Sequence, residues 1–196
     1  MNAWIVLLSA VVYWGGVSLR ALHIKRRLGR SPNLRPRGPK EKWLWAGWAT
    51  VVLGWVFTPA LTRDFGERVF FRPFPFLEAP FFVCLGLAAI AAGFAGTVWC
   101  HAALGDAWRV GVGGEKTPLV TNGPYQRLRH PLYFFQIVIL SGVFWLFPSP
   151  FVLSLEALHL ALVCVKIADE ERHLERLHGS LYKEYRQHTG TLWPKV

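Results

Sequence analysis

Two polar clusters in the last third of the chain lie on either side of an apolar stretch. Residues 129–133 read Arg-His-Pro-Leu-Tyr, and residues 169–172 read Asp-Glu-Glu-Arg. Their imidazole, phenol and carboxylate groups can hold a polar ligand, and Glu170 or His130 could accept a proton from a substrate. Polar groups are costly to place beside lipid, so two such clusters at the ends of apolar segments indicate a functional site.

Each cluster has a simpler interpretation when it is taken alone. His130 could merely cap a helix whose first turn holds Pro131, a position that tolerates proline because the missing amide would be unpaired there anyway. The glutamates 170–171 could form a solvated acidic turn, paired with nearby arginines in surface ion pairs that contribute little stability. We predict one shared site because both polar clusters occur together in the same part of the chain.

The composition is typical of an integral membrane protein. Apolar residues make up 53% of the chain, with ten Trp and fourteen Phe among 196 residues, and the mean hydropathy is +0.28. This is too apolar for a soluble domain of the same size. The length suits one membrane domain, residues 1–196, with the polar motifs in 104–196, because several spans of about 20 residues each would take up nearly half of it.

Five apolar segments could cross a membrane. They comprise residues 4–19, 43–61, 79–100, 132–147 and 151–165. The last two form a tight hairpin, because Pro148 and Pro150 cannot continue a helix and restrict the residues before them. The predicted fold is therefore all-α and polytopic, with about five transmembrane helices and a cytoplasmic C-terminal helix that ends in Tyr182 and Tyr185.

The distribution of charge predicts an orientation. Residues 20–42 contain nine Lys or Arg and one acidic residue, whereas residues 62–78 carry three of each sign. The positive-inside rule then places the first connector in the cytoplasm, and alternation of the spans brings both polar clusters to that face. We expect a multi-pass protein of the cytoplasmic membrane whose site faces the cytosol. The first span is expected to be retained, since a signal peptide would carry its basic residues before the apolar run.

Other classes of site are not indicated. Cys84, Cys100 and Cys164 lie in apolar segments without paired ligand spacing, and the seven His form no pair typical of a metal site. The glycines of residues 93–96 fall inside a span and predict close helix packing rather than nucleotide binding. The basic connector is expected to contact membrane lipids, and nucleic acid is not an expected partner because no binding motif accompanies the charge.

In order and spacing, the C-terminal motifs resemble the isoprenylcysteine carboxyl methyltransferase family and, more loosely, the phospholipid N-methyltransferases. The shared motifs are Leu-Val-x-x-Gly-x-Tyr at residues 119–125, Arg-His-Pro-x-Tyr at 129–133, Glu-Glu at 170–171 and Gly-x-x-Tyr-x-x-Tyr at 179–185. They cover roughly the C-terminal half of the chain. Each motif alone is common, but the combination is specific.

The resemblance implies a pocket for S-adenosyl-L-methionine that is closed on the cytoplasmic side of the membrane. By match to the family motif, the residues implied to contact the cofactor are Leu119, Val120, Tyr125, His130, Pro131, Leu132, Tyr133 and Glu171. Lys166 and Glu170 fall where the family holds the acceptor, with Glu170 as the catalytic residue. An arginine commonly stands at the Lys166 position, and lysine lacks its planar two-pronged grip on a carboxylate.

The implied reaction transfers a methyl group to a lipophilic acceptor, either a small molecule or a lipidated substrate, with a carboxylate of the prenylcysteine type as the best guess. A carboxylate is already ionised at neutral pH, so the site mainly has to hold the nucleophile, methyl carbon and sulfur in line. We expect the acceptor to enter sideways through a gap between the hairpin and the third span. An amine acceptor, as in phospholipid N-methylation, would need Glu170 or His130 as a base.

Two other classes of protein stay open. Sterol reductases carry a related His-Pro-x-Tyr pattern with a nicotinamide cofactor, although the Asn common after that proline is Leu132 here. A non-catalytic membrane component could use the same clusters to seal a helix bundle. Binding of S-adenosylhomocysteine, of NADPH or of neither would separate the three, while the acceptor and the oligomeric state are not predicted.

Overall fold

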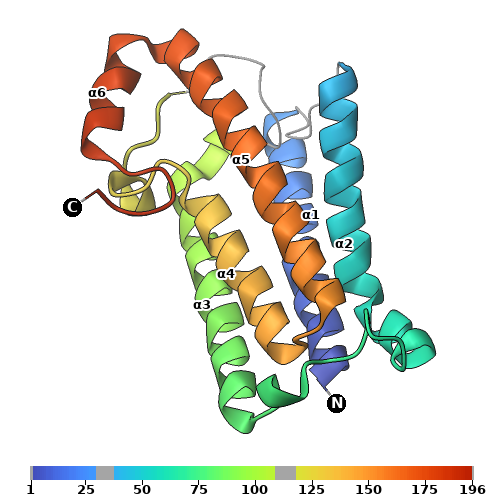
Figure 1. Ribbon diagram of the computed structural model, residues 1–196. Coiled ribbons are helices and arrows are strands. Elements are labelled where there is room, and N and C mark those ends of the chain that lie inside the picture. The colour runs from blue at the N-terminus through green and yellow to red at the C-terminus, as the bar shows by residue number, and fades with distance from the viewer. Residues whose placement is uncertain (1, 30–37, 109–117, 196) are drawn as a thin grey trace.

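The computed structural model describes residues 2–29, 38–108 and 118–195, which are mostly helical (Figure 1). The long helices are α1 (Asn2–Leu28), α2 (Pro39–Phe65), α3 (Pro80–Leu104), α4 (Pro131–Leu146), α5 (Pro150–His178) and α6 (Ser180–His188). Short 3-10 turns lie at η1 (Pro75–Leu77), η2 (Gly105–Ala107) and η3 (Gly123–Gln126). The all-α fold predicted from the sequence is confirmed.

Within the described ranges, four helices are long and apolar enough to cross a membrane, and a fifth apolar helix is shorter. The four are α1, α2, α3 together with η2, and α5. The fifth, α4, has 16 residues and is therefore about 24 Å long, somewhat less than the roughly 30 Å of a hydrocarbon core. Each apolar segment predicted from the sequence falls on one helix, and the polytopic membrane fold is confirmed.

Prolines set the beginnings of the helices. Pro39, Pro80, Pro131 and Pro150 each stand at the first position of α2, α3, α4 and α5, where a missing amide breaks no helical hydrogen bond. At the tip of the α4–α5 hairpin, the Ser149 hydroxyl accepts a hydrogen bond from the Val152 amide and caps α5. The tight hairpin predicted from the proline pattern is present.

Glycines bring α3 and α4 into close contact. Side chains at Gly86, Gly93 and Gly96 of α3 would collide with α4, and Gly142 of α4 faces the backbone of α3 in the same way. The close packing predicted for the glycines of residues 93–96 is therefore confirmed. The same seam contradicts the expected lateral gap between the third span and the hairpin, because these glycines let the two backbones meet where that gap was placed.

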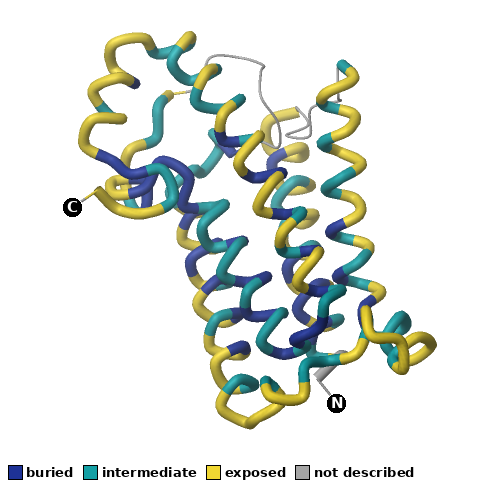
Figure 2. Tube along the Cα trace, in the orientation of Figure 1, coloured by how far each residue is buried: buried dark blue, intermediate teal, exposed yellow. Residues whose placement is uncertain are grey.

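The buried residues lie toward the inside of the bundle and the exposed residues toward its outside (Figure 2). The core includes Tyr13 and Trp55, and the Trp55 indole donates a hydrogen bond to the Ser9 hydroxyl at 3.2 Å. Large apolar side chains such as Phe57 and Val98 are exposed on the outside. An apolar exterior around satisfied helices suits a protein whose solvent is lipid.

The acidic pair at residues 170–171 lies within a helix and not in a turn before one. No proline or glycine interrupts residues 151–178, so α5 continues through the pair to His178. It ends at Gly179, whose φ of 55° turns the chain sharply into α6. The interpretation of the pair as a solvated acidic turn is wrong.

Candidate functional site

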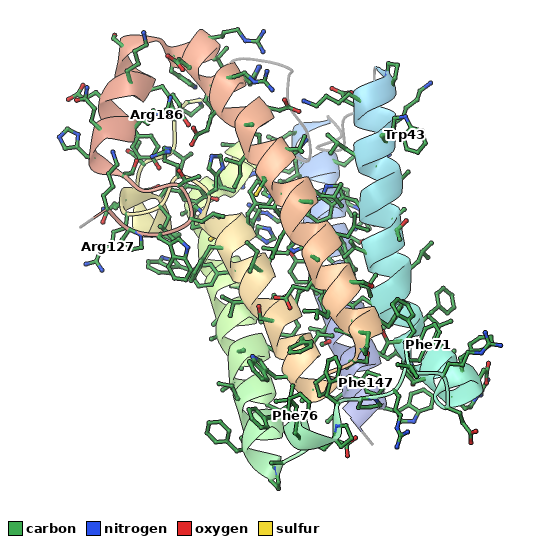
Figure 3. The ribbon with its side chains drawn as sticks, in the orientation of Figure 1. Trp43, Phe71, Phe76, Arg127, Phe147 and Arg186 are labelled. Carbon is green, nitrogen blue, oxygen red and sulfur yellow. The ribbon has the colours of Figure 1, made fainter. Side chains whose placement is uncertain are left out.

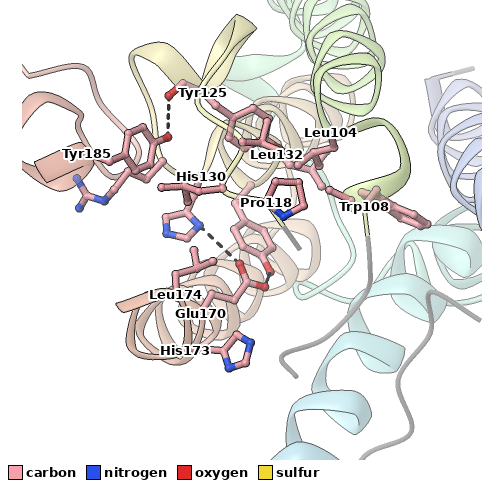
Figure 4. Close-up of a pocket in the computed structure, with 15 residues that line it drawn as sticks. Leu104, Trp108, Pro118, Tyr125, His130, Leu132, Glu170, His173, Leu174 and Tyr185 are labelled. Atoms are coloured by element: carbon pink, nitrogen blue, oxygen red, sulfur yellow. Dashed lines mark hydrogen bonds and ion pairs between the residues drawn. The ribbon is translucent and has the colours of Figure 1, made fainter. Parts of the chain in front are cut away.

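A cavity of about 170 Å³ lies at the end of the bundle where α3 and α5 end and α4 begins (Figure 4). Its walls are Leu104, Ala107 and Trp108 after α3, Pro118, Leu119, Val120, Tyr125 and Arg129 in the following segment, His130, Leu132 and Tyr133 at α4, Glu170, His173 and Leu174 of α5, and Tyr185 of α6. The two polar clusters of the sequence therefore meet in one place.

Glu170 is the carboxylate on the cavity wall, and two residues of the other cluster hold it. The Tyr133 hydroxyl donates a hydrogen bond to Glu170 Oε1 at 2.7 Å. His130 Nδ1 lies 3.6 Å from Glu170 Oε2. His130 therefore faces α5 instead of capping α4, and its side chain makes no capping hydrogen bond to that helix.

Glu171 lies behind this wall in a buried ion pair. Its Oε1 accepts a hydrogen bond from Arg129 Nε at 2.8 Å and lies 3.4 Å from His130 Nε2. The side chains of Arg129 and Glu171 are only 6% and 15% exposed. A pair so poorly hydrated is sensitive to the loss of either partner, because the remaining charge would be buried alone.

The charge state of His130 follows from these contacts. Burial by itself lowers the pKa of His130, but the carboxylates of Glu170 and Glu171, 3.6 and 3.4 Å from its two ring nitrogens, outweigh this effect. The net result is a pKa above the ordinary value of a histidine. The imidazolium form is therefore the form that the site favours, and it balances one of the two carboxylates.

The tyrosines next to the cavity stay protonated. Burial raises the pKa of Tyr125, and it raises the pKa of Tyr185 to about 12. The Tyr185 hydroxyl donates to the Tyr125 carbonyl at 2.7 Å, shown in Figure 4, and its oxygen lies 3.3 Å from the Leu128 carbonyl. At neutral pH these phenols act as hydrogen-bond donors and not as anions.

The C-terminal segment clamps the backbone that carries the Arg-His pair. The amides of Arg129 and His130 donate to the carbonyls of Gly190 and Thr191 at 2.8 and 3.1 Å. The Arg129 guanidinium also donates to the Thr189 carbonyl and to the Thr191 hydroxyl. The last residues of the chain thus fix the position of His130 relative to α5.

Most of the residues implied by the sequence resemblance line the cavity. Those on the wall are Leu119, Val120, Tyr125, His130, Leu132, Tyr133 and Glu170. Pro131 is buried in the first turn of α4, and Glu171 lies behind His130. Lys166 is half-buried on α5, one turn before Glu170 and outside the wall of the cavity.

Several wall residues were not predicted. His173 and Leu174 could have been found, because they follow Glu170 by three and four positions and so share its face of α5. Leu104, Ala107 and Trp108 carry no signal in the sequence, since the end of α3 reaches the site only through the packing of α3 on α4 and η3. Arg129 and Tyr185 were recognised as motif residues without a role at the site.

The chemistry of the wall suits a ligand with both a ring system and a cationic or hydroxyl group. Trp108, Leu119 and Leu132 provide apolar surfaces, while Glu170 provides a carboxylate for a positive charge or a hydroxyl group. The volume is below the roughly 300–1,000 Å³ of typical small-molecule sites. A nucleoside-sized cofactor would therefore fill this cavity and extend beyond the described wall. Among the described residues, no cluster of His, Cys, Asp or Glu could hold a metal ion.

Comparisons with known proteins bear on the family and on the fold. A model of the phospholipid methyltransferase family matches residues 81–180, about half of the chain. The structure is similar to that of a eukaryotic intramembrane Ras methyltransferase, isoprenylcysteine carboxyl methyltransferase, with a TM-score of 0.58 over 82% of this chain and 55% of that one. Their sequence identity is 22%, so this likeness shows the fold.

Two curated proteins that are named for metal resistance also match. The nickel-cobalt-cadmium resistance protein NccN of Alcaligenes xylosoxydans xylosoxydans is 27% identical over 57% of this chain. The cobalt-zinc-cadmium resistance protein CzcN of Cupriavidus metallidurans is 28% identical over 60%. The aligned part spans 49% and 51% of those two proteins, so the chain covers about half the length of each.

Proposed function

The chain belongs to the phospholipid methyltransferase family, whose model spans both polar clusters, and from this membership we propose that it transfers a methyl group from S-adenosyl-L-methionine to a lipophilic acceptor. Membership supports a membrane methyltransferase, and the identity of the cofactor and the acceptor is our proposal. The observation that carries it is the convergence of His130, Tyr133 and Glu170 on one cavity at the end of a membrane helix bundle.

The residues around the cavity have separate proposed roles. Leu119, Val120, Tyr125, Leu132 and Tyr133 would form the walls against the cofactor, with His130 and Glu171 fixing their frame and Pro131 starting α4 beside them. S-adenosyl-L-methionine would supply a methyl group on a positively charged sulfur. Tyr133 holds Glu170 at a defined position, and a fixed carboxylate can orient a cationic ligand without reorganisation during the reaction.

For a carboxylate acceptor, an oxygen lone pair forms the new bond to the methyl carbon while the carbon–sulfur bond breaks and its electron pair stays on sulfur. No proton has to move, so the chain's task is alignment and exclusion of water. Lys166 lies one turn before Glu170 and could offer a positive charge to such an acceptor. A lipidated carboxylate of the prenylcysteine type is therefore our first proposal for the acceptor.

An amine acceptor is the second candidate, favoured by the phospholipid methyltransferase match. An ammonium group must lose a proton before or during transfer. His130 is poorly placed to accept it, because its contacts with two glutamates favour the protonated form. Glu170 is then the base that the cavity offers.

Contacts at the same end of the bundle support an orientation for the site. The last turn of α1 carries Lys25, Arg26 and Arg27, and the Arg20 guanidinium donates to the Gly105 carbonyl at 2.6 Å. The basic end of α1 therefore lies beside η2, which leads to the Trp108 wall of the cavity. By the positive-inside rule, we propose that this end faces the cytosol, in the cytoplasmic membrane.

The proposal is tested by incubating membranes that contain the full chain with methyl-labelled S-adenosyl-L-methionine and a lipid extract. Label should enter the lipid or membrane-protein fraction, and it should depend on Glu170 when compared with membranes that carry Glu170→Gln. Base treatment then releases methyl esters as methanol and leaves methylamines intact, which separates the two acceptors. Turnover that requires NADPH instead, or equal labelling without the chain, would overturn the proposal.

A further inference from the structure

A second and larger cavity lies at the opposite end of the bundle. Its volume is about 870 Å³, and it is lined by the beginnings of α1 and α3, the ends of α2 and α4, and the connector between α2 and α3. Figure 3 shows Phe71 and Phe147 gathered at this end, away from Arg186 of α6. A volume of this size is within the range of small-molecule sites.

The wall of this cavity is mainly apolar and includes five aromatic side chains. Trp4, Phe57, Phe71, Trp145 and Phe147 all line it. The connector that closes it is tied to the hairpin tip, because the Phe74 amide donates to the Pro148 carbonyl at 2.7 Å and the Phe151 amide donates to the Phe70 carbonyl at 2.9 Å. An apolar cavity at a helix-bundle end, in a protein solvated by lipid, is suited to a hydrocarbon chain.

Charges of opposite sign lie beside the aromatic wall. Arg63 and Glu78 both line the cavity, one from the end of α2 and one from the connector before α3. Arg63 Nε donates a hydrogen bond to Asp64 Oδ1 at 2.8 Å, but the two side chains are 77% and 50% exposed. Such an exposed pair contributes little, so the guanidinium can exchange this partner for a phosphate, which it can grip with two parallel hydrogen bonds.

We propose that this second cavity binds a zwitterionic phospholipid from the leaflet opposite the candidate methyltransfer site. One acyl chain lies against the aromatic wall, the phosphate contacts Arg63, and the head-group ammonium lies toward Glu78. The lipid bound here is not the methyl acceptor, because α4 separates the cavities by its length of about 24 Å. Its role is to hold the connector of residues 66–79 on the bundle.

The test uses the full chain purified in detergent and stripped of lipid. Dioleoyl phosphatidylethanolamine is added, and bound lipid is counted by native mass spectrometry beside phosphatidylglycerol and diacylglycerol as competitors. Wild type should retain phosphatidylethanolamine in preference to both, and Arg63→Glu should weaken retention about tenfold, the loss expected for a charge-assisted contact. Glu78→Lys should shift the preference toward phosphatidylglycerol.

Arg68→Glu is the matched control, since Arg68 lies on the same connector, above the Phe65 ring and outside the cavity wall. It should retain phosphatidylethanolamine as wild type does. A phosphatidylethanolamine with a diazirine in its acyl chain should crosslink near Phe57, Phe71 and Trp145. Equal retention by wild type and Arg63→Glu, equal retention of all three lipids, or crosslinks spread over the outer faces of the helices would each overturn the proposal.

Discussion

Two neighbouring glutamates have different surroundings and are expected to do different work. Glu170 lines the cavity and accepts a hydrogen bond from the Tyr133 hydroxyl, whereas Glu171 lies behind the cavity wall and is paired with Arg129. The sequence resemblance gave Glu170 a catalytic role and Glu171 a cofactor contact. The pairing of Glu171 with Arg129 could not be predicted, because it depends on which helix face meets Arg129. Substitutions at the two positions should therefore change different measured quantities.

Glu170→Gln should remove most turnover and leave the fold intact. The amide oxygen can still accept the Tyr133 hydroxyl, so the loss is that of one negative charge at the cavity. With a carboxylate acceptor Glu170 only orients the cationic ligand, and we expect the rate of methyl transfer to fall about 10²–10³-fold. With an amine acceptor it is also the proposed base, and the fall should be about 10²–10⁴-fold. Initial rates with labelled S-adenosyl-L-methionine check this, and a variant with the wild-type rate would contradict the role of Glu170.

Glu171→Ala should destabilise the protein. Removing one partner of a buried pair leaves Arg129 uncompensated, and because Glu171 keeps slight contact with solvent we expect a cost of about 3 kcal/mol, at the low end of the usual range. The comparison is Glu175→Ala. The more exposed Glu175 side chain pairs with exposed Lys183 and Arg186, so this substitution should cost less than about 1 kcal/mol. Thermal unfolding in detergent measures both, and equal losses would show that the Glu171 pair is not special.

The raised pKa of His130 makes one part of the stability depend on pH. The folded protein binds the His130 proton more tightly than the unfolded chain does, so this contribution is complete below about pH 6.5 and is lost as the pH rises through the higher pKa of the folded state. The melting temperature of wild type should fall more than that of His130→Gln between pH 6 and pH 9. Parallel curves for the two proteins would mean that the imidazolium is not stabilised by the glutamates.

At the scale of elements, the sequence predicted what depends on local pattern. The apolar segments, the prolines at helix starts and the close packing at Gly93 and Gly96 all follow from residue type and spacing. The clamp of Gly190 and Thr191 on the Arg-His backbone could not be predicted, because a single parallel bridge has no periodic signal. The sequence also suggested that the acceptor enters between the third span and the hairpin, and the closely packed α3–α4 seam contradicts that route.

Gly93→Val should destabilise the seam between α3 and α4. The first carbon of a side chain at Gly93 would lie 2.9 Å from the Phe135 carbonyl oxygen and would collide with Ile139. The helices would have to separate or their backbones shift, which should lower the free energy of unfolding by about 1–3 kcal/mol. Gly15→Ala on α1 is the control, since nothing lies within 4 Å of the added carbon, and it should be neutral or stabilising. Thermal unfolding distinguishes the two, and a neutral Gly93→Val would contradict the tight seam.

At the scale of the whole molecule, the sequence predicted that two distant segments meet at one end of the bundle, and they do. Tyr133 and Glu170 are hydrogen-bonded although 37 positions separate them. The contribution of Trp108 and its neighbours was missed, because it depends on how α3 packs against the rest of the bundle. The division into a small cavity that joins both polar clusters at one end and a larger, mainly apolar one at the other emerges only from the assembled helices.

The most direct test of the central claim is calorimetric titration of the purified full chain with S-adenosylhomocysteine. Wild type should bind it saturably and should not bind NADPH, while Leu132→Trp, which fills the cavity, should abolish binding and keep the elution volume and helicity of the folded protein. Binding of NADPH instead, or wild-type affinity in the folded Leu132→Trp variant, would contradict a methyl-donor site at this cavity.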